Sequence, residues 1–340
     1  NYSFMRLTIC LLMIVLFLSC NNEPSRPDVS NISVNLVTRR FEKELFLIDS
    51  TQRTPALDKL IGSYPSFGEH FLSSILNADP RWSADSVSQY VYGFVSSYRN
   101  LYDSAEKIFN DFSPYEKEIK QGIRYVKHYY PAYKAPREII TYIGPLDGYG
   151  DILTEDALVV GLHQHLGSNF SQYKTTWVQE TYPQYITNRF TPEYISVNCM
   201  KNIVLDMYPE KSEDKSLVYQ MVEKGKRLYM LSRLLPETDE YKLIGYTQKQ
   251  LKDCYEHETQ IWDLFVQNNF LQTIDNNVIK NYIGEGPKTQ ELGESSPGNI
   301  GSFAGWQIVK QYMKKLPKTK LPDLMKTDAE IIFQEARYKP

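Results

Sequence analysis

The sequence predicts an α+β fold that is mostly α-helical. Two short runs rich in β-branched residues, 138–144 and 157–162, lie in the middle of the chain and are typical of strands. A loop with Gly and Pro separates them, so we expect an antiparallel pair. On both sides apolar residues recur every three or four positions, as on one face of a helix. Helices, a small sheet and helices again indicate an α+β domain.

The N-terminal third is expected to be one strand followed by helices. Residues 34–41 alternate well enough for a strand. Over 85–112 the apolar positions step by three or four, which predicts one long helix. The next helix should begin at Ser113, with serine as the cap, Pro114 in the first turn and Glu116 reaching back.

The C-terminal half is expected to be helical. One helix should open at Thr191 and Pro192 and run through Met207, and a second should run from Ser216 to Leu235. A capping box predicts the start of a third, which would extend to about residue 271; its residues are Thr247 and Gln250. A Gly-rich loop, 285–305, leads into the helix WQIVKQYM, and a short last helix should be capped by Thr327 with Glu330.

The first 19 residues have the features of a signal peptide. Their apolar run, 7–18, is shorter than the ~20 residues of a membrane-spanning helix. The run ends in FLSC, which resembles a lipobox, the signal for cleavage before Cys20 and attachment of lipid to it. The alternative is an ordinary secretory signal cut nearby. We expect residues 20–33 to be a lipid-anchored linker and 34–340 to be a single domain.

Composition limits the partners. The net charge of −3, with Lys and Glu interspersed, provides no basic stripe for nucleic acid. The 26 tyrosines suit half-buried surfaces and binding clefts. Cys199 and Cys254 lie in expected helices without the spacing of a disulfide framework, and whether they are bridged stays open.

Residues 256–262, EHETQIW, resemble the zinc motif H-E-x-x-H, in which two histidines hold the metal and glutamate acts as the base. His257 and Glu258 fit this motif, but Ile261 stands where the second histidine should be. We therefore expect an amphipathic helix with Ile261 in the core and His257 on the solvated face.

His163 and His165 are a second candidate for metal binding. Residues two apart on a strand point to the same side, so these two histidines could share a metal ion. Glu155 and Asp156 are the only acids nearby. The alternative is a pair of histidines at a strand edge or turn with no ligand role.

The Gly-rich stretch is a candidate binding site. Gly298, Gly301 and Gly305 would bring the backbone close to the helix that contains Trp306, where free N–H groups could hold an anion. Tight packing of the loop is the alternative. The stretch lacks the G-K-[ST] of a phosphate loop, and the chain lacks the G-x-S-x-G elbow of a serine nucleophile.

Several of these segments, taken in order, resemble the gliding-motility lipoprotein GldB family. The similarity covers most of the mature chain and rests on the lipobox and on these segments: NLVTRRFEKELF, ALVVGLHQHLG, TPEYISVNCMKNIV, MVEKGKRLYMLSRLLP, SPGNIGSFAGWQIVKQYM and ARYKP. No single segment is a strict signature.

The family is in turn similar to predicted zinc peptidases with a zincin-like core. The resemblance places their zinc helix on 195–204, which contains no histidine here and offers Asn198, Cys199, Lys201 and Asn202 instead. On the next helix Glu223 and Gly225 match the segment of the third ligand, but Lys224 and Lys226 flank the position. The resemblance therefore implies a zincin-like fold without catalytic zinc.

The resemblance implies a non-catalytic envelope lipoprotein, an assembly or binding factor in gliding and its associated protein secretion. It would need no cofactor, would be held at the outer membrane by its lipid, on the periplasmic face or the cell surface, and would have envelope proteins as partners. Its candidate binding groove would comprise Glu223, Gly298, Gly301, Gly305 and Trp306. The alternatives are a metallopeptidase using His163, His165 and Glu223, or a lipoprotein that binds peptide or glycan in a tyrosine-lined cleft near the Gly-rich loop.

Overall fold

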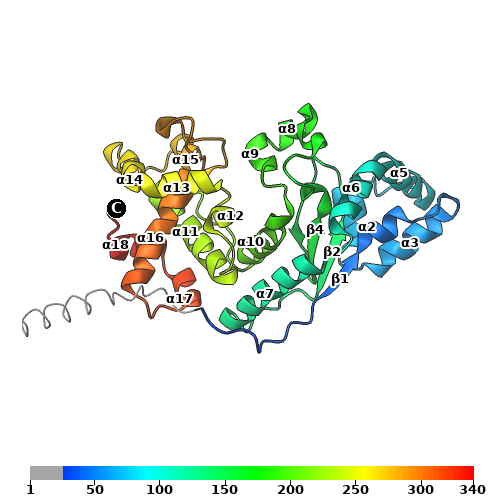
Figure 1. Ribbon diagram of the computed structural model, residues 1–340, viewed down its shortest axis with the longest axis horizontal. Helices are drawn as coiled ribbons and strands as arrows, with labels where there is room; N and C mark the ends of the chain where they lie inside the picture. The colour runs from blue at the N-terminus through cyan, green and yellow to red at the C-terminus, as the bar shows by residue number, and fades with distance from the viewer. Residues whose placement is uncertain (1–25) are drawn as a thin grey trace, which may run out of the picture.

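The structure is a computed structural model that describes residues 26–340. Its sheet has four strands in the order β1-β2-β4-β3. β2 (Glu138–Tyr142) and β4 (Ala157–Gly161) form the centre. Their side chains are almost entirely buried, as expected of strands covered on both faces. The sheet lies to the right of the middle in Figure 1, with helices on both sides of it.

The strands of this sheet do not all run as expected. β2 and β4 are parallel, so the expectation of an antiparallel pair was wrong. The connection 143–156 is long enough to return the chain to the starting edge of the sheet, which a parallel pair requires. It includes β3 (Ile152–Leu153), which is antiparallel to β4. β1 (Val37–Arg40), shorter than expected, runs parallel to β2.

The N-terminal helices contain two corrections. The long helix expected over 85–112 is two helices, α5 (Ala84–Ser97) and α6 (Arg99–Phe109), because the backbone of Tyr98 leaves the helical conformation. Its ring stacks on Phe94, so the apolar spacing continues across the break. The other helices of this part are α2 (Phe41–Phe46), α3 (Arg53–Ser63), α4 (Gly68–His70) and α7 (Ser113–Tyr129).

The start of α7 also differs from the expectation. The helix begins at Ser113, but its hydroxyl makes no capping bond. Asp111 instead accepts a hydrogen bond from the Ser113 N–H at 2.9 Å. Glu116 accepts bonds from Lys120 and Thr38, so its carboxylate ties α7 to β1 rather than reaching back along the helix.

The C-terminal half is helical, as predicted. α11 (Leu217–Leu234) follows Ser216, and the capping box of Thr247 and Gln250 is present. The helix expected from Thr247 to about residue 271 is interrupted at His257, whose backbone is not helical. The helices here are α8 (Thr176–Thr181), α9 (Gln184–Thr187), α10 (Ile195–Met207), α12 (Glu240–Ile244), α13 (Gln248–Glu256), α14 (Glu258–Gln267) and α15 (Asn276–Ile283).

The last helices begin at other residues than expected. α16 (Ile300–Lys315) starts six residues before WQIVKQYM, so Gly301 and Gly305 lie inside a helix. α17 (Leu321–Lys326) leads to α18 (Ala329–Ala336), which is capped by the Asp328 side chain and not by Thr327. α16 packs along α11 at the helical end of the molecule (Figure 1).

The first described residues, 26–36, form a strap along one edge of the molecule, between the helical end and the sheet (Figure 1). Arg26 forms an ion pair with Glu237, in the loop between α11 and α12. Val29 is only 2% exposed. Lys127 of α7 donates a hydrogen bond to the carbonyl of Ser33 at 3.0 Å. This part of the expected linker therefore packs on the protein.

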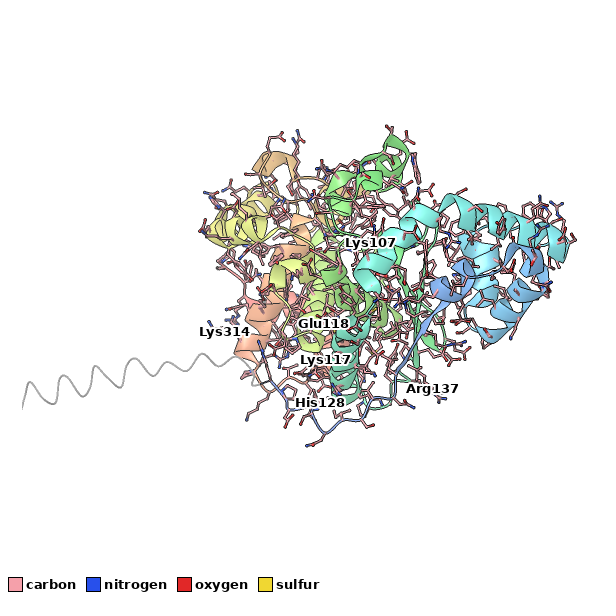
Figure 2. The ribbon with its side chains drawn as sticks, turned by 45° about the vertical axis from the view of Figure 1, so that its right-hand side comes forward. Lys107, Lys117, Glu118, His128, Arg137 and Lys314 are labelled. Carbon is pink, nitrogen blue, oxygen red and sulfur yellow. The ribbon has the colours of Figure 1, made fainter. Side chains whose placement is uncertain are left out.

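Charges of both signs are spread over the surface. Figure 2 shows Lys117, Glu118 and His128 along α7, with Lys107 of α6 above them and Lys314 of α16 to their left. Within residues 26–340, no helix combines the length and the apolar character needed to cross a membrane.

Candidate functional site

A pocket of about 410 Å³ lies between the α9–α10 segment, the α12–α13 connection and the Gly-rich loop. We call it the tyrosine pocket, because four tyrosines line it: Tyr185, Tyr194, Tyr241 and Tyr246. Gly245 has φ +85°, the left-handed conformation that ends α12 and lets the chain turn into α13. A Cβ atom at this position would overlap the guanidinium of Arg189, so glycine also leaves space for the pocket wall.

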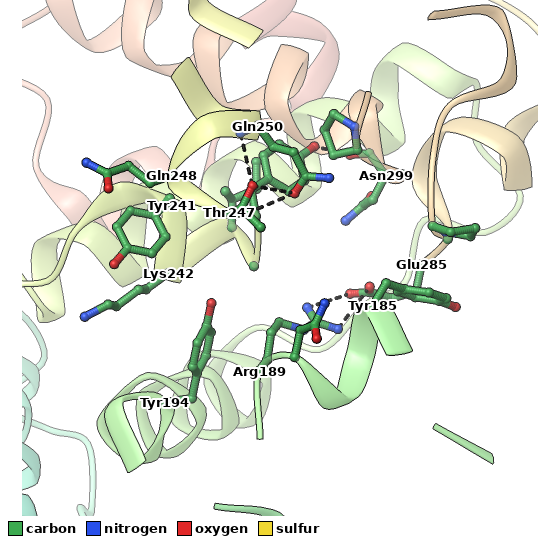
Figure 3. A pocket seen from close by; sticks show the side chains of 18 of the residues that line it. Tyr185, Arg189, Tyr194, Tyr241, Lys242, Thr247, Gln248, Gln250, Glu285 and Asn299 are labelled. Atoms are coloured by element: carbon green, nitrogen blue, oxygen red, sulfur yellow. Dashed lines mark hydrogen bonds and ion pairs between the residues drawn. The ribbon is translucent and has the colours of Figure 1, made fainter. Parts of the chain in front are cut away.

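Two of the tyrosines differ in their hydrogen bonds. Tyr246 donates to the carbonyl of Asn299 at 3.1 Å and ties the α12–α13 connection to the Gly-rich loop. Tyr194 is only 7% exposed, yet its hydroxyl has no hydrogen-bond partner among residues 26–340. Burial raises the pKa of Tyr194 to about 12, against the opposing effect of Arg189. In Figure 3 this hydroxyl points across the pocket toward Tyr241 and Lys242.

The charges that line the pocket balance. Arg189 forms an ion pair with Glu285 at 3.2 Å, which joins the α9–α10 segment to the Gly-rich loop (Figure 3). The other lining charges are Lys242 and Glu193. Half-buried Lys201 lies near enough to Arg189 and Glu285 to interact electrostatically with both. Burial and the positive charge of Arg189 lower the pKa of this lysine to about 8.

The Gly-rich loop is held in shape by its own contacts. Thr289 donates a hydrogen bond to the carbonyl of Pro297 at 2.8 Å, and Ser296 donates to the carbonyl of Thr289 at 2.9 Å. A Cβ atom on Gly298 would overlap the carbonyl of Gly286, so the two sides of the loop touch. The loop therefore forms a well-packed wall of the pocket.

The structure does not bring the five expected groove residues together. Gly298 lines the tyrosine pocket. Gly301 and Gly305 face neighbouring helices, since a Cβ atom on Gly301 would lie 2.9 Å from the Tyr282 carbonyl and one on Gly305 would overlap that of Met221. Trp306 is fully buried.

Glu223, the remaining groove candidate, lies on α11. It accepts a hydrogen bond from Lys226 at 2.6 Å and forms a second ion pair with Arg227 at 3.3 Å. Lys226 also donates to the carbonyl of Thr327, next to α18. The carboxylate is therefore engaged between helices and does not line the tyrosine pocket.

His163 and His165 lie in a buried turn after β4, and their ring nitrogens have different kinds of hydrogen-bond partner. Nδ1 of His163 accepts from the Gly144 N–H at 3.1 Å, and Nε2 donates to the Tyr149 carbonyl at 3.0 Å. Such a ring is neutral, and burial lowers the pKa of His163 to about 4. Both His165 nitrogens face oxygen acceptors, the Thr191 carbonyl at 3.0 Å and the Asp151 carboxylate at 2.8 Å.

Only the protonated ring of His165 can donate to both acceptors, so this setting favours the imidazolium form. Burial works against its charge, but the Asp151 carboxylate more than offsets this and raises the pKa of His165. Asp151 also accepts from the Asn198 amide at 2.8 Å, and its backbone carbonyl accepts from the Asn202 amide at 3.0 Å. The two asparagines of α10 thus hold the segment that holds His165.

The alternative metal ligands do not meet. His163 and His165 are beside the sheet, whereas Glu223 is bonded next to α18. Among residues 26–340 there is no group of three or more His, Cys, Asp or Glu side chains that could hold a metal ion. In EHETQIW, His257 is exposed and Ile261 is buried, as expected.

Cys199 and Cys254 are both free and buried. Burial raises the pKa of Cys199 well above its ordinary value and that of Cys254 to about 12. Neither thiol is poised as a thiolate nucleophile. Cys20 lies outside the described residues.

Sequence reasoning missed most of the pocket. Tyr185, Arg189, Tyr241, Lys242 and Glu285 belong to three separate segments with no shared motif. The abundance of tyrosine suggested a tyrosine-lined cleft near the Gly-rich loop, but it did not say which tyrosines would line it. The Gly-rich loop was identified, but Gly298 alone of its three candidate glycines lines the pocket.

Comparison with known proteins identifies the family. A family model described as gliding motility protein GldB matches residues 22–340. No curated protein and no solved structure is similar enough to the chain to match it. The family match spans nearly the whole chain, from before the strap to the last residue, and includes every segment on which the resemblance rested except the lipobox. The chain belongs to the gliding motility protein GldB family.

Proposed function

We propose that this chain is a non-catalytic lipoprotein of the outer membrane that acts as an assembly or binding factor in gliding and the protein secretion associated with it. Membership of a lipoprotein family associates the chain with the cell envelope. The more specific role rests on the tyrosine pocket, into which Tyr194 presents a hydroxyl that makes no hydrogen bond within residues 26–340. A ligand in the pocket can bond to this hydroxyl in place of water.

The surroundings of the two candidate histidines and of the cysteines support a non-catalytic role. A general base or a metal ligand needs a free ring nitrogen, and both nitrogens of His163 and of His165 are bonded to the protein. The two described cysteines are buried thiols with raised pKa values.

We also propose that the fold descends from a zincin-like scaffold. Asn198 and Asn202 are four residues apart on α10, the spacing of the two histidines in H-E-x-x-H. Both amides bond to Asp151, so these positions now serve a structural contact. The order of elements supports the same proposal, since α10 follows the sheet, α11 carries Glu223 and Gly225, and a Gly-rich loop precedes α16.

Complementation of a strain that lacks the gene tests the binding role. The full chain with Tyr241→Ala should reach normal protein levels but support reduced colony spreading. Tyr92→Ala is the matched control, because Tyr92 is also a partly exposed helical tyrosine but lies on α5, outside the tyrosine pocket. Normal spreading with the Tyr241 variant would contradict a role for the pocket.

A second pair of measurements tests the absence of catalysis. Glu223→Gln should leave colony spreading intact wherever the protein accumulates, since Glu223 only pairs with Lys226 and Arg227. Loss of spreading together with loss of a peptide-cleaving activity of the purified chain would instead establish the metallopeptidase.

A further inference from the structure

We infer that the tyrosine pocket binds a short neutral saccharide. The inference rests on the proposed function as a binding factor and specifies its ligand. The volume of about 410 Å³ falls within the ~300–1,000 Å³ typical of small-molecule sites, so the pocket is larger than a single ion requires.

The tyrosines match the two kinds of surface on a pyranose. Like that of Tyr194, the hydroxyls of Tyr185 and Tyr241 have no hydrogen-bond partner within the described chain. A tyrosine hydroxyl both donates and accepts, as a sugar hydroxyl does. A tyrosine ring offers an apolar face for the C–H side of the sugar. The three tyrosines around this cavity thus offer hydroxyls for hydrogen bonds to the sugar and ring faces for its apolar side.

Side-chain amides add planar donor and acceptor pairs. Asn188, Gln248 and Asn299 line the pocket. An amide carries an acceptor oxygen and a donor nitrogen in one plane and can bond two neighbouring hydroxyls of a sugar ring. The Asn299 oxygen is held by the Ser302 hydroxyl at 2.7 Å, which fixes its carboxamide in place. Such fixed groups reduce the entropy lost when a flexible sugar binds.

Other ligand classes fit less well. Two cations and two acids line the cavity, and Arg189 is already paired with Glu285, so the lining carries no net charge that would favour an ion. Ile244 and two prolines are its only aliphatic side chains, too few for an acyl chain or an apolar peptide anchor. None of the described strands lines the pocket, so an extended peptide finds no sheet edge to pair with.

A glycan array with neutral and acidic oligosaccharides, probed with the full lipidated chain in detergent, tests the inference. Neutral oligosaccharides should bind, and calorimetry with the strongest should give one site per chain. Tyr194→Phe removes only the unpaired hydroxyl and should weaken binding about tenfold. Tyr92→Phe, the same change outside the pocket, should leave the affinity unchanged. The melting temperature of each variant shows whether it is folded.

Three results would overturn the inference: no neutral oligosaccharide binds, acidic oligosaccharides or a tetrapeptide library bind instead, or Tyr194→Phe binds the neutral glycan as well as the parent chain. Two sources share the expected chemistry, the surface polysaccharide of the cell and a polysaccharide outside it. If polysaccharide extracted from the host surface competes for the pocket, the ligand comes from the cell's own surface. If soluble starch competes and the host polysaccharide does not, the ligand comes from outside the cell.

The inference and the proposed function can fail separately. If Tyr241→Ala impairs colony spreading while no neutral glycan binds, the ligand assignment is wrong and the binding role stands. If the array detects a neutral glycan but the strain with Tyr241→Ala spreads normally, the proposal that the pocket acts in gliding is wrong.

Discussion

Gly225 of α11 and Gly305 of α16 face each other so closely that a Cβ atom on Gly225 would overlap the carbonyl oxygen of Gly305. A Cβ atom on Gly305 would likewise overlap the Met221 carbonyl. Both obstacles are backbone, which cannot rotate away as a flexible side chain can. The approach of the two longest C-terminal helices therefore depends on the absence of both side chains.

Gly305→Ala is expected to lower the free energy of unfolding by about 3 kcal/mol, because the methyl group would force the helices apart. Urea denaturation measures this. Gly93→Ala is the matched control: a Cβ atom there meets nothing within 4 Å, and alanine in a helix should add about 0.5–1 kcal/mol. Equal stability of the Gly305 variant and the parent would contradict the packing argument.

Asp151→Asn is expected to cost about 3–5 kcal/mol of stability, as when one partner of a buried ion pair is removed. One carboxylate oxygen accepts from the Gly161 N–H and the other from His165 and Asn198. Whichever way the new amide is turned, its NH₂ group faces a donor. Asp147→Asn, in the same loop but exposed, should change denaturant stability little. A similar loss in both variants would indicate an effect of the loop rather than of the ion pair.

His163 should make the protein acid-sensitive. Its pKa is about 4 in the folded chain and ordinarily 6.5, so between these values the unfolded chain binds the proton more readily. Stability from this group is full above pH 6.5 and falls, by up to about 3 kcal/mol, as the pH drops toward 4. In His163→Gln this part of the loss should vanish, so its stability curve is flatter over that range. His128→Gln, at an exposed position, should retain the parent slope.

Cys20→Ala is expected to abolish incorporation of labelled palmitate and to release the chain from the membrane fraction. The FLSC junction motivates this prediction. Cys10→Ala, at the other cysteine of the signal segment, serves as the control and should keep the label. Palmitate that persists in the Cys20 variant would show that this cysteine is not the lipidation site.

Apolar spacing predicted which segments are helices or strands, because burial of one face leaves a periodic trace. It missed the breaks at Tyr98 and His257, where the same spacing continues across a change of direction. It also could not give the direction of β2 and β4, since fully buried strands have the same pattern in either orientation. The tyrosine pocket left no local pattern, because segments more than a hundred residues apart meet there through the fold.

The strap sets how the molecule would stand on a membrane. If Cys20 carries lipid, only about six residues connect it to Arg26, a reach of about 20 Å when fully extended. Arg26 is bound beside Glu237, at the helical end. A tether of this length would keep the helical end of the body close to the bilayer. A membrane-anchored partner could then recognise it by rotation in the plane rather than by a three-dimensional search.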